Sequence, residues 1–225
     1  MASFEQHVNG AVIATGVVIV PLHTASLLNV EQSLIALALG LVGGILPDLD
    51  SDNSKPLQIV FKIFSIFLPL IFLLSLFGES TLFELMIYWI LSSFILHITL
   101  FKIFTTITIH RGVIHSIPMG ILFGQITTYF FYTAFGYELI FSTLAGLFLT
   151  YGFFIHLLLD ELVSLNALGL KMKKSFGTAF KLYDTNNIFG TLFLYILVIG
   201  FFFLIPINTD VFMEIFEIMK SVKVY

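Results

Sequence analysis

The chain consists mainly of long apolar segments separated by short polar stretches. A helix needs about 20 apolar residues to cross roughly 30 Å of hydrocarbon. Seven candidate segments occur, at residues 10–28, 33–46, 57–77, 82–104, 117–135, 139–159 and 188–206. The pattern therefore predicts an all-α fold, a polytopic bundle of about seven transmembrane helices that forms one domain over residues 1–206.

The C-terminal segment has a different pattern. Asp210, Glu214, Glu217 and Ser221 share one helical face between residues 210 and 222, and apolar residues occupy most of the other. This arrangement is typical of an amphipathic helix that lies at a membrane interface. We expect residues 207–225 to form such a tail.

Composition supports the membrane assignment. Of the 225 residues, 58% are hydrophobic and 11% are charged, whereas soluble domains carry about 25% charged residues. The chain has no Cys, which excludes disulfides, thiolate nucleophiles and Cys-ligated zinc. With a net charge of −4 it also lacks the basic field that nucleic acid requires, so membrane lipids are the expected partners.

Lys and Arg are unevenly distributed between the two predicted membrane faces. Alternate crossings from the N-terminus put the loops at residues 47–56, 105–116 and 160–187 on the N-terminal side. Eight of the ten Lys and Arg residues fall on that side or at its span ends. Positive charge marks the cytoplasmic face, so we expect a multi-pass protein of a bacterial or archaeal cytoplasmic membrane, with its N-terminus inside.

The same face gathers most of the His and Asp residues. Its span ends hold four of the six His and four of the six Asp, together with one Arg: His7, Asp48, Asp50, Asp52, His110, Arg111, His115, His156 and Asp160. Ionisable groups at membrane depth are costly unless they are paired or ligated, and they commonly mark function. Imidazole and carboxylate ligands without Cys suit zinc or manganese.

The acidic cluster follows the Gly43-Gly44 pair after three residues. Asp48, Asp50 and Asp52 alternate in a turn, where a divalent cation would relieve their mutual repulsion. The same residues also fit a solvated acidic loop that caps the next helix.

The histidine clusters likewise have two interpretations. His110 and His115 flank Arg111 and fit either metal ligands or a polar interfacial turn. His156 and Asp160 are four residues apart and share a helix face. They fit either a ligand pair or a buried pair that stabilises the bundle.

The remaining histidines and the paired glycines indicate helix packing. We assign His23 and His97 to packing or interhelical hydrogen bonds. Gly-x-x-x-Gly pairs occur at residues 40–44 and 120–124, and this spacing lets helices approach closely in lipid.

The order of these motifs resembles that of a known family. A His precedes Gly10, Gly-Gly-Ile-Leu-Pro-Asp-Leu-Asp-Ser begins at Gly43, His-Arg-Gly-x-x-His-Ser begins at His110, and His-Leu-Leu-Leu-Asp ends at Asp160. This is similar to the YdjM-like family, which is described as LexA-binding, inner-membrane-associated and metal-dependent hydrolases. LexA binding is implied by that description alone.

The resemblance also implies a ligand set. It comprises His7, Asp48, Asp50, His110, His115, His156 and Asp160, with Arg111 beside it. Ile114 stands where the family often has Thr, and residues 161–164 depart from the usual ending. Both departures could alter a hydrogen bond around the ligands, and neither removes a ligand.

The expected function follows from the number and depth of these groups. Seven candidates exceed the three or four ligands of one catalytic zinc, which favours a two-metal centre of the kind used in phosphoester cleavage. Asp52 or Asp50 is the expected general base, and Arg111 would bind developing negative charge. We expect hydrolysis of a phosphoester or ester bond in a lipid-like substrate by metal-activated water.

The sequence leaves open the identity and number of the metal ions, and two alternative functions. Zinc is the first expectation and manganese the second, with one or two ions bound. A metal or ion transporter and a non-catalytic scaffold with a structural metal site are the alternative functions. An intramembrane metalloprotease is disfavoured because the chain has no His-Glu-x-x-His motif.

Overall fold

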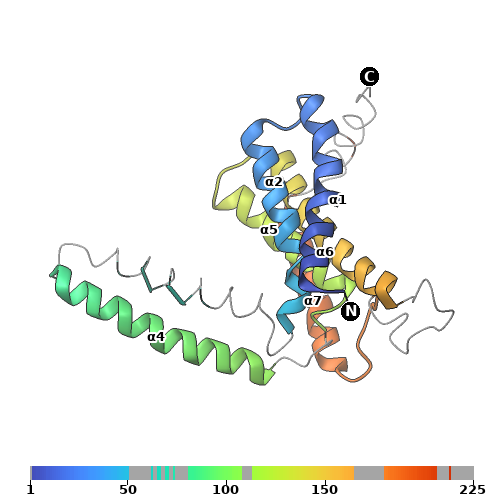
Figure 1. The fold of residues 1–225 in the computed structure, drawn as a ribbon. Helices are drawn as coiled ribbons and strands as arrows, with labels where there is room; N and C mark the ends of the chain where they lie inside the picture. The colour runs from blue at the N-terminus through green and yellow to red at the C-terminus, as the bar shows by residue number, and fades with distance from the viewer. Residues whose placement is uncertain are drawn as a thin grey trace. The chain divides into compact units, whose positions relative to one another are not determined.

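The computed structural model describes residues 2–50, 62, 65–66, 69–70, 73, 81–107, 113–164, 180–206 and 213. Within these residues the fold is helical and contains no strand, as Figure 1 shows. The helices are α1 (Phe4–Thr24), α2 (Val30–Gly43), η1 (Leu46–Asp50), α4 (Leu82–Ile107), α5 (Ile117–Thr133), α6 (Leu139–Ser164) and α7 (Ile188–Leu204). The predicted all-α class is confirmed for this part of the chain.

Several of these helices are suited to a membrane. Four segments are long and apolar enough to cross one: Phe4–Thr24, Val30–Asp48, Leu82–Thr99 and Leu139–Val163. The helices α5 and α7 are shorter, at 17 residues each. The predicted span at residues 57–77 and the predicted tail at 207–225 lie largely outside the described residues. The count of seven spans therefore stays a prediction.

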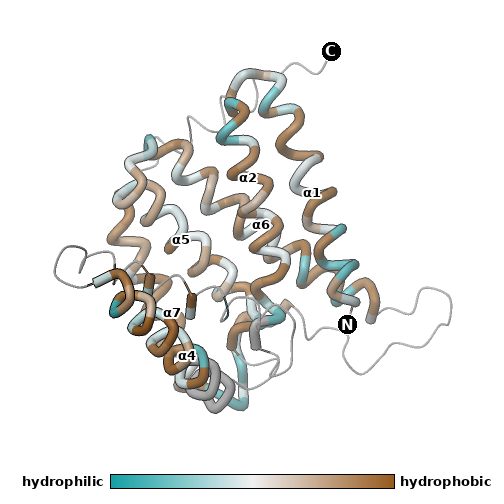
Figure 2. The backbone as a smooth tube through the Cα atoms, turned by 60° about the vertical axis from the view of Figure 1, so that its left-hand side comes forward, coloured by the Kyte–Doolittle hydropathy of each residue, from teal (hydrophilic) through white to brown (hydrophobic). Residues whose placement is uncertain are grey.

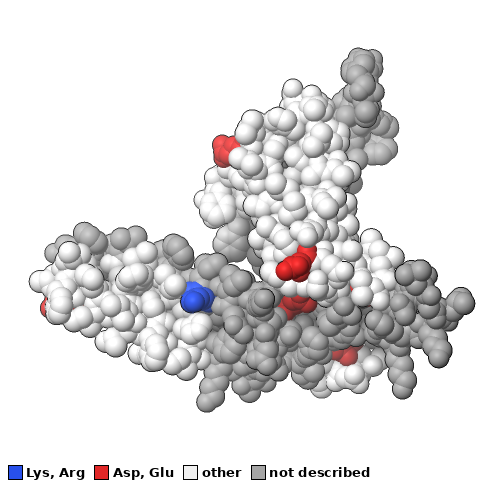
Figure 3. All heavy atoms as spheres, viewed as in Figure 1, with Lys and Arg blue, Asp and Glu red and all other residues white. Residues whose placement is uncertain are grey.

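The surface agrees with this assignment. The residues of the long helices are mostly hydrophobic, as their colours in Figure 2 show. Charged side chains are sparse on the visible face of the described residues (Figure 3). Many large apolar side chains are exposed, among them Phe83, Phe189 and Phe203. In a membrane these side chains contact lipid.

The chain divides into two compact units, one of residues 1–47 with 113–225 and one of residues 48–112. In the second unit, α4 is joined to the preceding segment by two hydrogen bonds. Trp89 Nε1 donates to the Ile66 carbonyl at 3.0 Å, and His97 Nδ1 lies 3.0 Å from Ser65 Oγ. The predicted hydrogen-bonding role of His97 is confirmed.

In the first unit, α6 is the central helix. It packs against α1, α2 and α5, while α7 packs against α5. The contacts of its glycines show that α2 runs parallel to α6 and that α5 runs antiparallel to it. Residues in the two halves of α6 belong to separate apolar clusters, one around Phe148 and one around Phe153. We call the end of the bundle that carries His7 and Asp160 the histidine end, and the other the distal end.

Glycines set the close approach of α6 to its neighbours. A Cβ on Gly152 would collide with the Gly40 carbonyl of α2, and a Cβ on Gly43 would collide with the Leu149 carbonyl. On the α5 side, a Cβ on Gly120 would lie 2.7 Å from the Phe153 ring. The backbones of α2 and α6 therefore touch without side chains between them, while Gly120 makes room for the Phe153 ring. The Gly40–Gly44 pair itself faces Thr15 and Ala11 of α1, so its spacing allows the close approach of α1 and α2.

A tight turn joins α1 to α2 at the distal end. His23 Nδ1 donates to the Leu28 carbonyl at 2.9 Å and lies 3.2 Å from Ser33 Oγ. Asn29 then caps α2 in a reciprocal capping box with Gln32. The predicted packing and hydrogen-bonding role of His23 is confirmed.

Candidate metal centre

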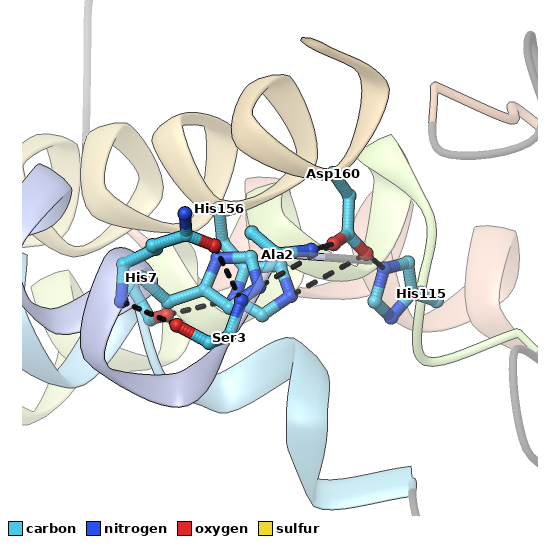
Figure 4. A network of polar contacts seen from close by, with 8 residues as sticks. Ala2, Ser3, His7, His115, His156 and Asp160 are labelled. Carbon is cyan, nitrogen blue, oxygen red and sulfur yellow. Dashed lines mark hydrogen bonds and ion pairs between the residues drawn. The ribbon is translucent and has the colours of Figure 1, made fainter. Parts of the chain in front are cut away.

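Four polar side chains from three separate segments meet at the histidine end, as Figure 4 shows. His7 comes from the second turn of α1, His115 from the turn before α5, and His156 and Asp160 from the C-terminal part of α6. All four are buried, with between 0% and 4% of each residue exposed. We call these four residues the histidine cluster.

The Asp160 carboxylate lies at the centre of the cluster. Its Oδ1 accepts a 2.9 Å hydrogen bond from the Ala2 backbone N–H and lies 3.4 Å from His7 Nε2. Its Oδ2 lies 3.3 Å from His115 Nε2 and 4.0 Å from His156 Nε2. Three imidazoles thus direct the same ring nitrogen toward one carboxylate, and His7 and His115 approach different oxygens of it.

His156 is oriented by α2. Its Nδ1 donates a 2.8 Å hydrogen bond to the carbonyl of Gly44, the residue that ends α2. This bond places the ring proton on Nδ1, so the lone pair is on Nε2, which faces Asp160. The His156 ring also stacks on His7, with centroids 3.6 Å apart and an interplanar angle of 8°.

A capping box positions His7. Ser3 Oγ accepts from the Gln6 backbone N–H at 3.3 Å, and Gln6 Oε1 accepts from the Ser3 N–H at 2.7 Å. This reciprocal pair begins α1 at a defined residue. His7 therefore falls on the buried face of the helix, and the preceding backbone brings Ala2 to Asp160.

The turn that carries His115 is fixed on both sides. The Ser116 hydroxyl donates to the Val113 carbonyl, and the Ile117 N–H donates to the Lys181 carbonyl at 3.1 Å. Pro118 lies in the first turn of α5, where its missing N–H costs nothing. The segment before α7 thus holds the start of α5 in place and His115 with it.

The donor set fits a divalent metal ion. His7, His156 and Asp160 offer ligand atoms that all lie within 4.8 Å of one another. Ligands about 2.0–2.1 Å from a tetrahedral zinc lie roughly 3.3–3.4 Å apart, close to the distances of His7 and His115 from Asp160. Within the described part of the chain, neither His7 nor His115 makes a side-chain hydrogen bond through its buried ring nitrogens. An ion bound beside Asp160 would satisfy the Nε2 atom of each ring.

The other predicted site residues are placed less fully. Asp48 lies in η1 with a half-buried side chain, and Asp50 ends η1. Asp52, His110 and Arg111 lie outside the described residues. The structure thus brings together His7, His115, His156 and Asp160, and the other predicted ligands stay predictions.

The comparison with known families agrees with the order of these motifs. The family model described as YdjM inner membrane protein matches residues 1–205, nearly the whole chain. The chain belongs to the YdjM inner membrane protein family. No curated protein and no solved structure matches it. The YdjM match includes every residue of the histidine cluster.

Two backbone groups also contact the histidine cluster, and the residue types along the chain do not predict them. They are the Ala2 N–H, which contacts Asp160, and the Gly44 carbonyl, which accepts from His156. Backbone groups have no residue-type signal. The nearest sequence clue is the Gly43-Gly44 pair, whose second member exposes a carbonyl at the end of α2.

Proposed function

We propose that this chain is a membrane-embedded, metal-dependent hydrolase that acts at the cytoplasmic head-group level on a phosphoester or ester bond of a lipid-like substrate. The observation that carries the proposal is the convergence of three imidazole Nε2 atoms on the Asp160 carboxylate. Membership of an inner membrane family and the membrane-length helices of the described residues support a membrane location.

The described residues have distinct roles in this proposal. His7, His156 and Asp160 would hold the metal, and His115 approaches the second oxygen of the same carboxylate. A carboxylate that faces different imidazoles through its two oxygens suits either one ion or a pair of ions. When bound, a divalent ion acidifies water and supplies a nucleophile at neutral pH. Zinc is the first candidate and manganese the second.

Two further side chains, predicted from the sequence motifs, complete the proposed chemistry. Asp52 or Asp50 would accept a proton from the attacking water, and Arg111 would stabilise negative charge on the substrate. Both roles rest on the position of these residues in the motifs.

A scaffold with a structural metal site is the second candidate. The burial of all four members of the histidine cluster favours it, because structural zinc sites are closed whereas catalytic sites keep an open position. In that case the ion would tie together α1, α6 and the start of α5.

A transporter has less support from the described residues. It needs polar groups that continue from the histidine cluster toward the other face. Between His7 and His23 the buried face of α1 carries Ala11, Thr15 and Ile19, so no ionisable side chain follows His7 along this face.

Metal content and hydrolysis measured together test the proposal. Detergent-purified wild type is compared with His156→Ala and with His23→Ala, a control histidine at the distal end that hydrogen-bonds only outside the cluster. We expect wild type and His23→Ala to retain metal and to hydrolyse bis(p-nitrophenyl) phosphate or phospholipid vesicles. His156→Ala should lose both properties.

The other results are equally informative. Metal in wild type without hydrolysis of any phosphoester or ester, together with a lower melting temperature on chelation, supports the scaffold instead. No metal after loading with zinc and manganese refutes both the hydrolase and the scaffold.

A further inference from the structure

An apolar groove of about 630 Å³ runs between α1 and α6 in the distal half of the first unit. Val17, Pro21 and Leu22 line it on α1, and Ile140, Leu147 and Phe154 line it on α6. None of its lining residues is charged. The hydroxyl of Thr150, one of the lining residues, donates to carbonyls of α5 and α6. The groove therefore offers a ligand almost entirely hydrocarbon contacts.

The position of the groove along α6 corresponds to one leaflet. Its lining runs from Ile140 to Phe154, a rise of about 21 Å at 1.5 Å per residue. The candidate span Leu139–Val163 has its midpoint near residue 151, so the groove covers the N-terminal half of the span and ends about 4.5 Å beyond the midpoint. One leaflet contributes about 15 Å of hydrocarbon. The groove thus crosses the leaflet on the distal side, away from Asp160.

The groove is too narrow for a helix. The whole free space of the groove, including its open side, is about 1440 Å³, and spread over about 21 Å it gives a mean cross-section of about 70 Å². A helix with side chains is about 10–12 Å wide, which corresponds to roughly 80–110 Å². An extended hydrocarbon chain fits this cross-section, whereas a helix of this chain or of a partner protein does not.

The distal rim of the groove is acidic. Glu138 precedes the lining residue Ile140 by two positions, and Glu31 accepts a 2.6 Å hydrogen bond from Tyr137 at the same end. Among the described residues of the first unit, Lys181 carries the basic side chain. It lies at the histidine end, where its backbone carbonyl accepts from the start of α5. The ammonium of a zwitterionic head group therefore complements this rim, whereas a head group with net negative charge is repelled by it.

We propose that the groove binds one acyl chain of phosphatidylethanolamine from the leaflet opposite the histidine cluster. Its volume lies in the range of about 300–1,000 Å³ typical of small-molecule sites. Bound there, the chain fills the space between α1 and α6 over the distal half of both helices. The proposal does not depend on the hydrolase function, because the groove lining ends at Phe154, about 9 Å along α6 from Asp160.

A matched pair of leucines tests the proposal. Leu147 lines the groove and is 45% exposed, while Leu158 on the same helix is 41% exposed and does not line it. Eleven residues apart, they point in nearly the same direction from α6. Each is replaced by Trp, and the proteins are reconstituted in vesicles of equal parts phosphatidylethanolamine and phosphatidylglycerol. After mild extraction, retained lipid is counted by native mass spectrometry.

We expect wild type and Leu158→Trp to retain one phosphatidylethanolamine per chain and Leu147→Trp to retain none. Equal retention by all three proteins, or no stoichiometric lipid in wild type, overturns the proposal. Retention of phosphatidylglycerol alone overturns the head-group assignment. Should Leu147→Trp not fold, Val17→Trp in the groove and Val20→Trp outside it form a second pair, since both valines are more than 60% exposed.

Fluorescence quenching tests the leaflet. In a Trp89→Phe background, a single tryptophan is introduced by Phe154→Trp in one variant and by Ile140→Trp in another. In the extracted protein–lipid complexes, a phosphatidylethanolamine brominated near the head-group end of its acyl chain should quench the Ile140→Trp variant more strongly than the Phe154→Trp variant. The reverse order would mean that the chain enters from the histidine end and would overturn the assignment of the leaflet.

Discussion

The His156 ring of α6 donates its Nδ1 proton to the Gly44 carbonyl at the end of α2. A single hydrogen bond thus joins two of the motifs in the sequence, the Gly-Gly-Ile-Leu-Pro-Asp segment and the His-x-x-x-Asp pair. It fixes the tautomer that presents Nε2 to Asp160. The Gly-Gly motif therefore contributes a backbone acceptor to the histidine cluster.

Replacing Asp160 with Asn should abolish metal binding. Asp160 contacts the Ala2 N–H, His7 and His115, and Asn removes the charge while nearly preserving the shape. Loss of a group that only orients a ligand costs about 10–100-fold in affinity, so we expect a larger loss here, measured by zinc titration. Glu84→Gln is the control, because the Glu84 carboxylate accepts hydrogen bonds from Thr81 in the second unit. Unchanged affinity in Asp160→Asn would contradict the assignment.

The two capping boxes of the α1–α2 hairpin should differ in their effect on the affinity for zinc. Ser3→Ala and Asn29→Ala each remove a cap and should each cost about 1 kcal/mol of stability. Only Ser3→Ala should also weaken zinc binding, because Ser3 begins the helix that carries His7. Thermal unfolding and zinc titration of both variants measure the two effects. Equal zinc affinities would show that the start of α1 does not position the cluster.

Gly152→Ala should destabilise the bundle. The added Cβ meets the Gly40 backbone, which cannot move away as a flexible side chain can, and overpacking of this kind costs about 1–3 kcal/mol. Gly16→Ala is the matched control, since a Cβ there meets nothing within 4 Å. It should be neutral or should stabilise α1 by up to about 1 kcal/mol. Unfolding in detergent distinguishes the two. A Gly152→Ala protein as stable as wild type would mean that the contact is loose.

The Tyr137–Glu31 contact should make stability fall at alkaline pH. The Tyr137 hydroxyl donates to Glu31 at 2.6 Å, and this bond raises the pKa of Tyr137 above its ordinary value. Since the pKa is raised in the folded state, the stabilisation is complete below about pH 10, the unfolded value, and is lost as pH rises through the folded value. Tyr137→Phe should remove this alkaline loss, and Tyr132→Phe should retain it. If the curves of stability against pH were the same for wild type and Tyr137→Phe, this assignment would be contradicted.

The sequence predicts helices and polar clusters better than it predicts how they meet. Long apolar runs predict α1, α4 and α6 because membrane length and helix periodicity are local properties. The spacing of His156 and Asp160 predicts a shared helix face for the same reason. The pairing of His7 with His156 is not local, because it depends on the register of two antiparallel helices. The Ala2 and Gly44 contacts are made by backbone groups, which any residue type provides.

The histidine cluster depends on chain length as well as on residue type. Gly40 contacts Gly152, and one helical turn later on both helices the Gly44 carbonyl receives the His156 proton. The glycine contact thus acts as a registration point for the parallel pair α2 and α6. Inserting one residue between Gly152 and His156 would rotate the imidazole by about 100° and break the match, even though every ligand would still be present. Deletions and insertions between Gly40 and Gly44 or between Gly152 and His156 should therefore damage the histidine cluster as much as the loss of a ligand.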